Sequence, residues 1–423
     1  MSLQIAKWGR TTFASLGVRN YRLYFIGQMI SQSGTFMQQV AQAWLVLKLT
    51  NSGTALGLIA ALQNLPVLLF APLGGALADR FPKRTLLLWT QTAFGFLALL
   101  LGALVIANVA QLWMVAALAF AFGIVNCIDN PTRQSFVVEM VGPSQLRNAV
   151  SLNSTMFNLS RIIGPALAGV LIAVIGMAPC FILNGLSYAA VIVTLLLMEV
   201  GELYAAVQVT SGRGQIAEGF RYAFSTPVVR NVLLIMAVIG TLTYEFQVSL
   251  PLLAEFTFQG NASAYAALSS ALGIGAVIGG LVTASRKSTS FNTVVVAALL
   301  FGLTALLAAF MPTLTLAVAA VVVLGFCSIY FSSTANTTVQ LASDPQMRGR
   351  VMALWAMAVL GSTTIGGPVI GFIGQQVSAR WALATGGAAA VAAAAFGIAA
   401  ARSAANPRRQ TRGRSESRQT ASD

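Results

Sequence analysis

The sequence predicts an all-α integral membrane protein with twelve transmembrane helices, arranged in two pseudo-symmetric halves of six. Three observations lead there: long apolar runs, few charges, and positive charge that falls almost wholly on every second hinge between the runs. Hydrophobic residues make up 57% of the chain and charged residues 9%, and the mean hydropathy is +0.78. A soluble globule of this composition would expose too much apolar surface, so the chain needs lipid around it.

Each predicted helix is an apolar stretch of bilayer length, because a membrane helix needs about 20 mostly apolar residues to cross about 30 Å of hydrocarbon. Backbone groups in lipid must be satisfied within their own segment, so long continuous runs favour helices over the alternating strands of a barrel. The predicted helices lie near residues 22–48, 54–78, 84–107, 111–133, 148–176, 179–199, 228–252, 263–284, 292–311, 314–340, 348–376 and 380–401.

The net charge of +14 has a topological explanation rather than a nucleic-acid partner. If the N-terminus is cytoplasmic, 22 of the 25 basic residues fall on inside hinges or termini. Only Lys48 and Arg380 fall outside, and Arg161 lies within a helix. Cytoplasmic loops of membrane proteins carry this excess of Lys and Arg. The sequence therefore predicts a multi-pass protein of the cell inner (plasma) membrane with both termini in the cytoplasm.

An internal repeat divides the chain. The stretch from Gln145 to Val150 returns as Gln346 to Val351, and Gly164-Pro165 returns as Gly367-Pro368. We expect an N-terminal half over 1–199, a cytoplasmic linker over 200–227, a C-terminal half over 228–402 and a disordered basic cytoplasmic tail over 403–423. Two six-helix repeats around a shared midplane site are the plan of alternating-access transporters.

Helix one carries a stripe of polar side chains, Gln28, Gln32, Thr35 and Gln39, at steps of four and three. So many amides on one face cannot point at lipid. The stripe must line a polar cavity or interlock with other helices, such as the fifth. Further candidates for the cavity wall, each of which is equally a candidate for a packing hydrogen bond, are Asn64, Asn126, Tyr244, Tyr330, Asn336 and Trp355.

The hinge between helices two and three reads Gly75-Ala-Leu-Ala-Asp79-Arg80-Phe-Pro82-Lys83-Arg84. It resembles the loop motif of the major facilitator superfamily, Gly-x-Leu-Ala-Asp-Arg-x-Gly-Arg-Lys, except at Pro82, where the family usually has Gly. With the twelve predicted helices and the repeat, the resemblance covers nearly the whole chain. Two finer patterns, Asn20-Tyr-Arg22 and Leu250-Pro251-Leu-Leu-Ala254, resemble the branch of drug and siderophore exporters that contains the enterobactin exporter.

The loop motif implies a conformational latch made of Gly75, Asp79, Arg80, Lys83 and Arg84. Asp79 stands at a helix end, where a carboxylate can hold facing helix termini and basic groups. Breaking such contacts would release one closed state. Plain anchoring at the inner membrane surface is the alternative, and it suffices for Lys83 and Arg84.

Helix five contains Gly164-Pro165-Ala-Leu-Ala-Gly169, which resembles the Gly-Pro-x-x-Gly-Gly element of family exporters, although Ala168 stands where the family has glycine. Gly164 and Gly169 permit close helix approach, and Pro165 frees a backbone carbonyl, so the segment is a candidate gate that can bend. Ordinary packing of small residues is the alternative. The resemblance favours export over import.

Three charges lie clearly inside predicted helices, where each costs several kcal/mol unless it is paired or wet. Asp129 can pair with Arg133 one turn away, so a structural pair and a coupling role are both open. Arg161 has no local partner and should face the cavity. Glu245 is the first candidate for a proton-coupling carboxylate, opposite Arg161, with a purely structural hydrogen bond as the alternative. Arg133 lies near the inner end of predicted helix four, so the family's mid-helix arginine is missing.

The sequence contains no motif that would indicate an enzyme. The chain has no His, which excludes histidine metal sites, haem ligation by His and His-based triads, and it lacks a P-loop. The glycines over 273–280 lie inside predicted helix eight with the wrong spacing for a dinucleotide loop, so we expect helix packing there. Cys127, Cys180 and Cys327 make no metal spacing. We expect no enzyme activity, no cofactor and no metal.

The function that these features predict is a secondary active transporter. It would export an amphipathic small molecule, such as a drug, siderophore or metabolite, by proton antiport with alternating access. An importer of the same fold and a non-transporting sensor or assembly partner are the alternatives. Expected partners are a small-molecule substrate, protons and membrane lipids, without nucleic acid, and the chain is expected to be a monomer.

Overall fold

The computed structural model describes residues 13–204, 215–284, 289–360 and 363–405, and within these ranges it contains helices and no strand. The first part of the predicted linker (205–214), the basic hinge at Arg286 and Lys287, and the tail from 406 onward lie outside the described residues. The predicted all-α class is confirmed.

The N-terminal half, called here the N half, is built from five long helices. One of them, α5, runs for 63 residues and departs from helical backbone angles at Gly142. Gly142 has φ +67°, a value that a residue without Cβ adopts at little cost, and Pro143 then begins the next stretch with no N–H to satisfy. The elements are η1 (Ala14–Gly17), α2 (Arg19–Thr50), α3 (Gly53–Arg80), α4 (Lys83–Ile106), α5 (Leu112–Val174), α6 (Ala178–Leu196) and η2 (Val200–Glu202).

This continuity corrects the predicted end of helix four. The sequence placed that end at Arg133 and a loop up to residue 147, whereas the helix continues to the Gly142 bend and resumes at once. Pro131 lies inside the helix without ending it. Arg133 therefore lies inside a continuous helix, about two and a half turns before the bend at Gly142.

The C-terminal half, called here the C half, has more interrupted helices. Predicted helix seven is broken before Phe246, and a π-helical turn follows it. Residues 215–225, expected in the linker, form helix α7, which packs on α8 and α13. The last helix continues three residues past the predicted boundary at 402. The elements are α7 (Gln215–Ser225), α8 (Pro227–Leu242), α9 (Phe246–Leu252), η3 (Leu253–Thr257), α10 (Ala262–Ala284), α11 (Phe291–Ala309), α12 (Leu314–Ala342), α13 (Arg348–Leu360), α14 (Thr363–Gln376) and α15 (Ala379–Ala405).

Ten segments of the described chain are long and apolar enough to cross a membrane. The bent helix α5 counts once among them, and α2 is absent because its glutamines lower its hydropathy. Dividing α5 at Gly142 and adding α2 matches the helices one by one to the twelve predicted spans. The count of twelve crossings stays a prediction. The described helices are those of a polytopic helical membrane protein.

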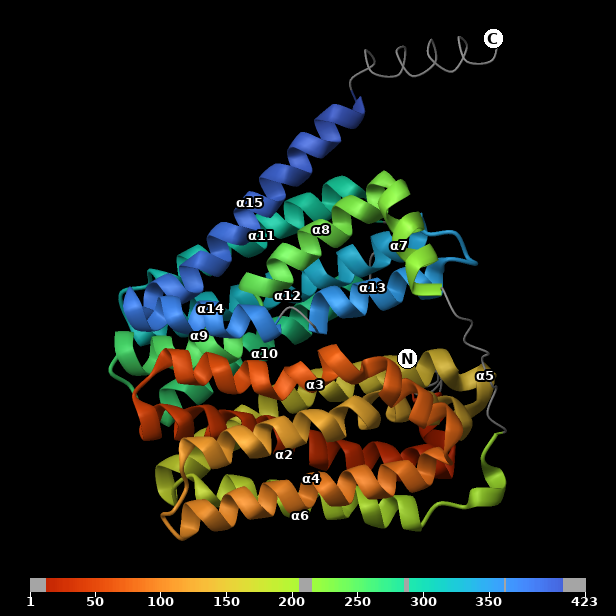
Figure 1. The fold of residues 1–423 in the computed structure, drawn as a ribbon, viewed down its shortest axis with the longest axis vertical. Helices are drawn as coiled ribbons and strands as arrows, with labels where there is room; N and C mark the ends of the chain where they lie inside the picture. The colour runs from red at the N-terminus through yellow and green to blue at the C-terminus, as the bar shows by residue number, and fades with distance from the viewer. Residues whose placement is uncertain (1–12, 205–214, 285–288, 361–362, 406–423) are drawn as a thin grey trace, which may run out of the picture.

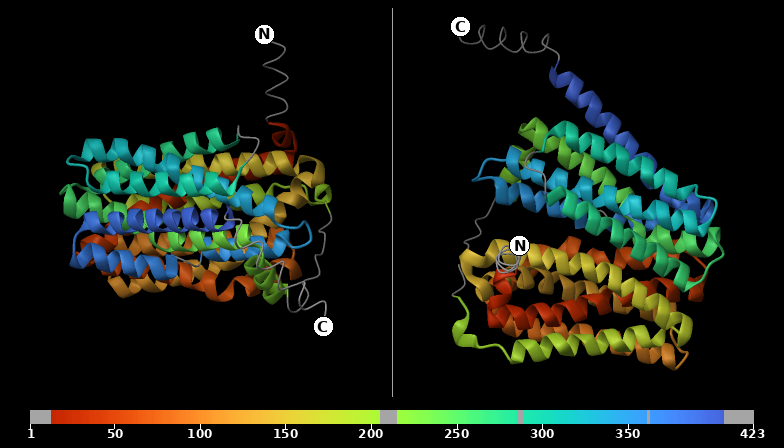
Figure 2. Two further views of the ribbon diagram at one scale, coloured as in Figure 1. Left: turned by 90° about the horizontal axis from the view of Figure 1, so that it is seen from above. Right: turned by 180° about the vertical axis from the view of Figure 1, so that it is seen from behind.

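The two halves form two adjacent layers of helices, α2–α6 in one and α8–α15 in the other (Figure 1; Figure 2). They meet where α3 packs on α14 and where α5 packs on α10. Glycines permit the first contact, because a Cβ on Gly57 would strike the carbonyl oxygen of Gly367 and one on Gly371 would strike that of Gly53. The backbone N–H of Gly53 also donates to Gln375 Oε1 at 2.6 Å.

Candidate functional site

A cavity with a volume of about 700 Å³ lies along α2 and α5. Its wall mixes amides and hydroxyls with apolar side chains and two arginines. Among the described residues of the wall, Ile329 of α12 is the one that comes from the C half. The wall consists of Tyr24, Gln28, Gln32, Asn130, Arg133, Gln134, Val137, Val138, Leu146, Val150, Asn153, Ser154, Met156, Phe157, Asn158, Arg161 and Ile329.

This cavity reaches from Arg161, halfway along the second arm of α5, to Leu146 beside the Gly142 bend. We call this end of the bundle the basic end, because it also carries the α3–α4 junction with Lys83 and Arg84. A second cavity of about 230 Å³ continues on the far side, sharing Phe157 and Arg161 with the first.

Beyond the smaller cavity the halves are joined by hydrogen bonds. Gln247 Nε2 of α9 donates to Gln39 Oε1 of α2 at 3.3 Å, and Ser263 Oγ of α10 donates to the carbonyl of Gly169 at 3.0 Å. The two halves therefore touch at the end opposite the basic end, and the large cavity lies on the basic side of that contact.

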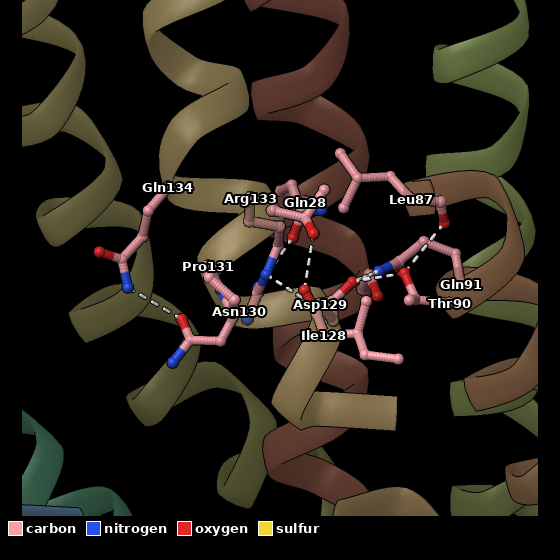
Figure 3. Close-up of polar contacts among 12 residues, drawn as sticks. Gln28, Leu87, Thr90, Gln91, Ile128, Asp129, Asn130, Pro131, Arg133 and Gln134 are labelled. Carbon is pink, nitrogen blue, oxygen red and sulfur yellow. Dashed lines mark hydrogen bonds and ion pairs between the residues drawn. The ribbon is translucent and has the colours of Figure 1, made fainter. Parts of the chain in front are cut away.

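Asp129 is fully engaged in a buried polar network, next in the chain to the cavity-lining Asn130 (Figure 3). Thr90 Oγ1 and Gln91 Nε2 of α4 donate to its Oδ1 at 2.7 and 2.8 Å. Its Oδ2 forms an ion pair with Arg133 Nε at 2.7 Å, and the Asp129 side chain is only 1% exposed. The pair that the one-turn spacing made available is thus formed, and it ties α4 to α5.

Arg133 presents the other edge of its guanidinium to the cavity wall. Its Nη1 donates to Gln28 Oε1 at 3.4 Å and to Gln32 Oε1 at 3.5 Å, which connects α5 to the amide stripe of α2. On the cavity-facing side of the same turn, Gln134 Nε2 donates to Asn130 Oδ1 at 3.1 Å (Figure 3).

Arg161 differs from Arg133 in having no ion pair or side-chain hydrogen bond within the described ranges. The side chain is half-buried and lines both cavities. Its backbone carbonyl lacks the usual helical donor, because the residue four positions on is Pro165. That carbonyl faces α10, where a Cβ on Gly273 would stand 2.9 Å from it.

Glu245 lies at the break between α8 and α9 and is 2% exposed. Its carboxylate packs on α14, where a Cβ on Gly366 would stand 2.8 Å from Oε1, and Oε1 has no hydrogen-bond partner. Glu245 lines neither of the two cavities, and the residue next to it, Tyr244, donates to the carbonyl of Ser328 at 2.6 Å. The carboxylate thus lies against α14 and not on the wall of either cavity that Arg161 lines.

The polar stripe of α2 divides between cavity and packing. Gln28 and Gln32 line the large cavity, and Gln39 lines the smaller one. Thr35 instead lies 3.0 Å from the Tyr188 hydroxyl of α6, in an interlocking hydrogen bond.

The other expected wall residues line neither of these two cavities. Asn64 Nδ2 donates to the carbonyl of Ala60 in its own helix at 2.9 Å. Asn336 Oδ1 accepts from Gln340 at 2.6 Å. The remaining four are Tyr244, whose hydroxyl donates to the carbonyl of Ser328, Asn126, which is partly buried, Tyr330, which stacks on Phe326, and Trp355, which lies in the hydrophobic core.

The predicted latch residues behave differently from one another. Arg84 Nε donates to the carbonyl of Leu195 at the end of α6 at 2.7 Å, and Lys83 Nζ pairs with Glu139 Oε1 at 2.8 Å. Asp79 and Arg80 are exposed and make no ion pair in the described part of the chain.

Glycines close to the latch and in the predicted gate have distinct surroundings. A Cβ on Gly75 would meet nothing within 4 Å, whereas one on Gly74 would strike the carbonyl of Cys127. In the predicted gate, Gly164 packs on the backbone of α2, and Gly169 packs on Ala266 of α10. Pro165 lines the smaller cavity. The gate segment therefore joins α5 to both halves.

Sequence reasoning did not assign Asn130, Gln134 and Phe157 to the cavity wall, and it placed Arg133 at a helix end. The signal that could have found them is the single Gly142-Pro143 pair, which is enough to turn the chain without a loop. The glycines expected to pack helices do so: Gly273 faces α5, and Gly275 and Gly279 face α12.

The described chain thus combines apolar spans of membrane length, two helical bundles packed on each other, and a large cavity along α2 and α5. The family of transmembrane secretion effectors matches residues 10–414, and the chain belongs to this family of the major facilitator superfamily. It is a membrane transporter and not an enzyme.

Curated relatives of similar length carry transporter names. The staphyloferrin A transporter of Staphylococcus aureus is 24% identical over 79% of this chain and 85% of its own. The multidrug efflux pump Tap of Mycolicibacterium fortuitum is 25% identical over 83% and 87%. The enterobactin exporter EntS of Escherichia coli O6:K15:H31 is 26% identical over 85% and 86%.

Solved structures share the fold. A POT family transporter in complex with a thioalcohol-conjugated peptide matches with a TM-score of 0.74 at 11% identity, over 91% of this chain and 96% of its own. A bacterial homologue of the lysosomal transporter Spinster, inward-facing and occupied, matches with a TM-score of 0.68 at 15% identity, over 91% and 97%. These similarities are evidence for the fold alone.

Proposed function

We propose that this membrane transporter exports an amphipathic small molecule that enters the 700 Å³ cavity from the basic end. The observation that carries the proposal is the composition of that cavity, in which amides such as Gln28, Gln32 and Asn158 alternate with apolar surface from Met156 and Phe157. Such a wall suits a ligand with a polar and an apolar part. Relatives named as siderophore and drug exporters support the direction of transport.

The basic end would be cytoplasmic, because positive charge is retained on the inner side of bacterial membranes. A single cysteine in place of Gln346, which is exposed near Arg348, should then resist an impermeant thiol reagent in intact cells. A cysteine in place of Asn261, at the opposite end before α10, should react. The reverse pattern would turn the cavity towards the outside and favour uptake.

Alternating access would proceed by closing the basic end and opening the far end. Asp79 is exposed while the large cavity is present, so its carboxylate is free to hold a facing helix terminus when the halves approach. The contact of Gly169 with α10 would have to separate in the same step. The freed carbonyl of Arg161 makes α5 able to bend there.

Proton coupling is assigned to Glu245 in this proposal. A charged carboxylate at a dry helix contact carries a penalty of several kcal/mol, so gain and loss of a proton would change the free energy of the contact with Gly366. Because α14 also packs on α3, that change would act on the contact between the halves. Asp129 is less suited, since Thr90, Gln91 and Arg133 already occupy its oxygens.

The experiment that tests export is a library screen in a host that lacks its own efflux pumps. Cells producing the full-length protein should accumulate less of at least one amphipathic compound than cells producing the Asp79→Asn variant at equal abundance. Equal accumulation of every compound would contradict export, and higher accumulation in wild-type cells would identify an importer. Counterflow in proteoliposomes then separates transport from a sensor that only binds.

A further inference from the structure

The cavity wall carries one positive charge that the described chain does not balance. Two arginines, Arg133 and Arg161, line the cavity. Arg133 is paired with Asp129 at 2.7 Å, so the two contribute no net charge. Arg161 makes no ion pair, and no acidic residue of the described ranges lines either cavity.

An uncompensated guanidinium inside a membrane protein is expensive, by several kcal/mol, unless water or a ligand solvates it. No ion pair or side-chain hydrogen bond of the described residues compensates that cost for Arg161. Its half-buried side chain borders open volume on both sides, next to Phe157, and its helix is held to α10 through the backbone instead. A charge kept in this place without a structural partner points to a ligand.

We propose that the transported molecule is an organic anion whose carboxylate, or an equivalent planar acidic group, pairs with Arg161. A guanidinium offers a planar fork of N–H donors that matches a carboxylate. The amides of Gln32 and Asn158 lie on the same wall for neutral oxygens and N–H groups, and Phe157 and Met156 offer apolar surface beside the charge. This inference rests on the proposed function, because it names the class of molecule that the same cavity accepts.

The position of Arg161 adds a reason for the pairing to matter in transport. Arg161 separates the large cavity from the smaller one, whose wall includes Phe246, Gln247 and Tyr265 of the C half. An anion bound there would sit at the boundary between the two halves. When the basic end closes and the far end opens, the bound anion would therefore lose access to the basic end and gain access to the far end.

The test uses three probes with one aromatic body and different charge: naphthoate, naphthamide and naphthylmethylammonium. Equilibrium dialysis against the purified full-length protein in detergent, with protein-free micelles subtracted, gives the affinities. Wild type should bind naphthoate more tightly than the other two. Arg161→Gln should weaken naphthoate about tenfold to a hundredfold, the range for losing a hydrogen bond to a charged group, and leave naphthamide unchanged.

Controls separate charge in the cavity from charge elsewhere. Lys48→Gln removes one positive charge at the exposed end of α2 and should leave all three affinities unchanged. Arg161→Lys should retain part of the naphthoate preference. If Arg161→Gln aggregates on size exclusion, the ranking of the probes on wild type and Arg161→Lys decides the matter.

Preference of the wild type for naphthylmethylammonium, equal binding of all three probes, or an Arg161→Gln variant with full naphthoate affinity would overturn the inference. Failure of the proposed function looks different. If naphthoate binding depends on Arg161 but no compound is exported, the anion site is supported and the export proposal is contradicted. If the protein exports neutral or cationic compounds and Arg161→Gln does not slow that export, the export proposal is supported and the anion site is contradicted.

Discussion

The Asp129–Arg133 pair offers a sharp test of whether the helix-four carboxylate is structural. Replacing Asp129 by Asn keeps an oxygen that can accept from Thr90 and Gln91 but removes the charge opposite Arg133 Nε. Breaking a buried pair from one side costs about 3–5 kcal/mol. The Arg133 side chain is 25% exposed to the cavity, so we expect a smaller loss, about 2 kcal/mol, for Asp129→Asn.

The converse change, Arg133→Gln, leaves a carboxylate that is 1% exposed without its cation, and we expect it to cost about 3 kcal/mol. The double variant leaves neither charge unpaired, so it should lose about 2 kcal/mol rather than the sum of about 5. Unfolding free energies from titration with SDS in mixed micelles measure all four proteins. Single losses that add to within about 0.5 kcal/mol in the double variant would refute the pairing argument.

Further predictions concern the contacts between the halves and the coupling carboxylate. Gly57→Ala drives a methyl group into the Gly367 backbone and should destabilise the contact of α3 with α14 by about 1–3 kcal/mol. Spin labels placed on the two halves at the basic end should then lie closer together than in wild type. Gly349→Ala, whose methyl group meets nothing within 4 Å, should leave the spin-label distances unchanged. Asp79→Asn should lower the transport rate strongly while substrate affinity and abundance stay near wild type; a defect confined to binding would oppose the latch. Glu245→Gln should abolish efflux driven by a pH gradient but keep exchange of substrate across the membrane; gradient-driven efflux at the wild-type rate would move the assignment elsewhere.

Periodicity and hydropathy predicted the helices well because bilayer thickness fixes their length. The predicted hinge between helices two and three, for example, coincides with the end of α3 at Arg80 and the start of α4 at Lys83. The same reasoning failed at Gly142, because it ended predicted helix four at the charged residue Arg133, whereas the helix continues to Gly142. Charged residues can continue a helix when a partner such as Asp129 or a cavity solvates them.

The candidate site was harder to predict than the helices. The stripe on α2 led us to expect that its polar side chains face a cavity or a neighbouring helix, but spacing along one helix does not tell the two apart. Gln28 faces the cavity and Thr35 faces Tyr188, although they lie on one stripe. The burial of Glu245 against α14 depends on the break before α9, which nothing in the local sequence marked.

Direction of transport is the central claim, and it can be measured in oriented membrane vesicles. Everted vesicles containing the full-length protein should accumulate a compound identified by the efflux screen when respiration energises them, and the gradient should collapse on adding a proton ionophore. Vesicles with Glu245→Gln should not accumulate it. Accumulation in right-side-out vesicles instead, or in everted vesicles without any dependence on energisation, would contradict proton-driven export.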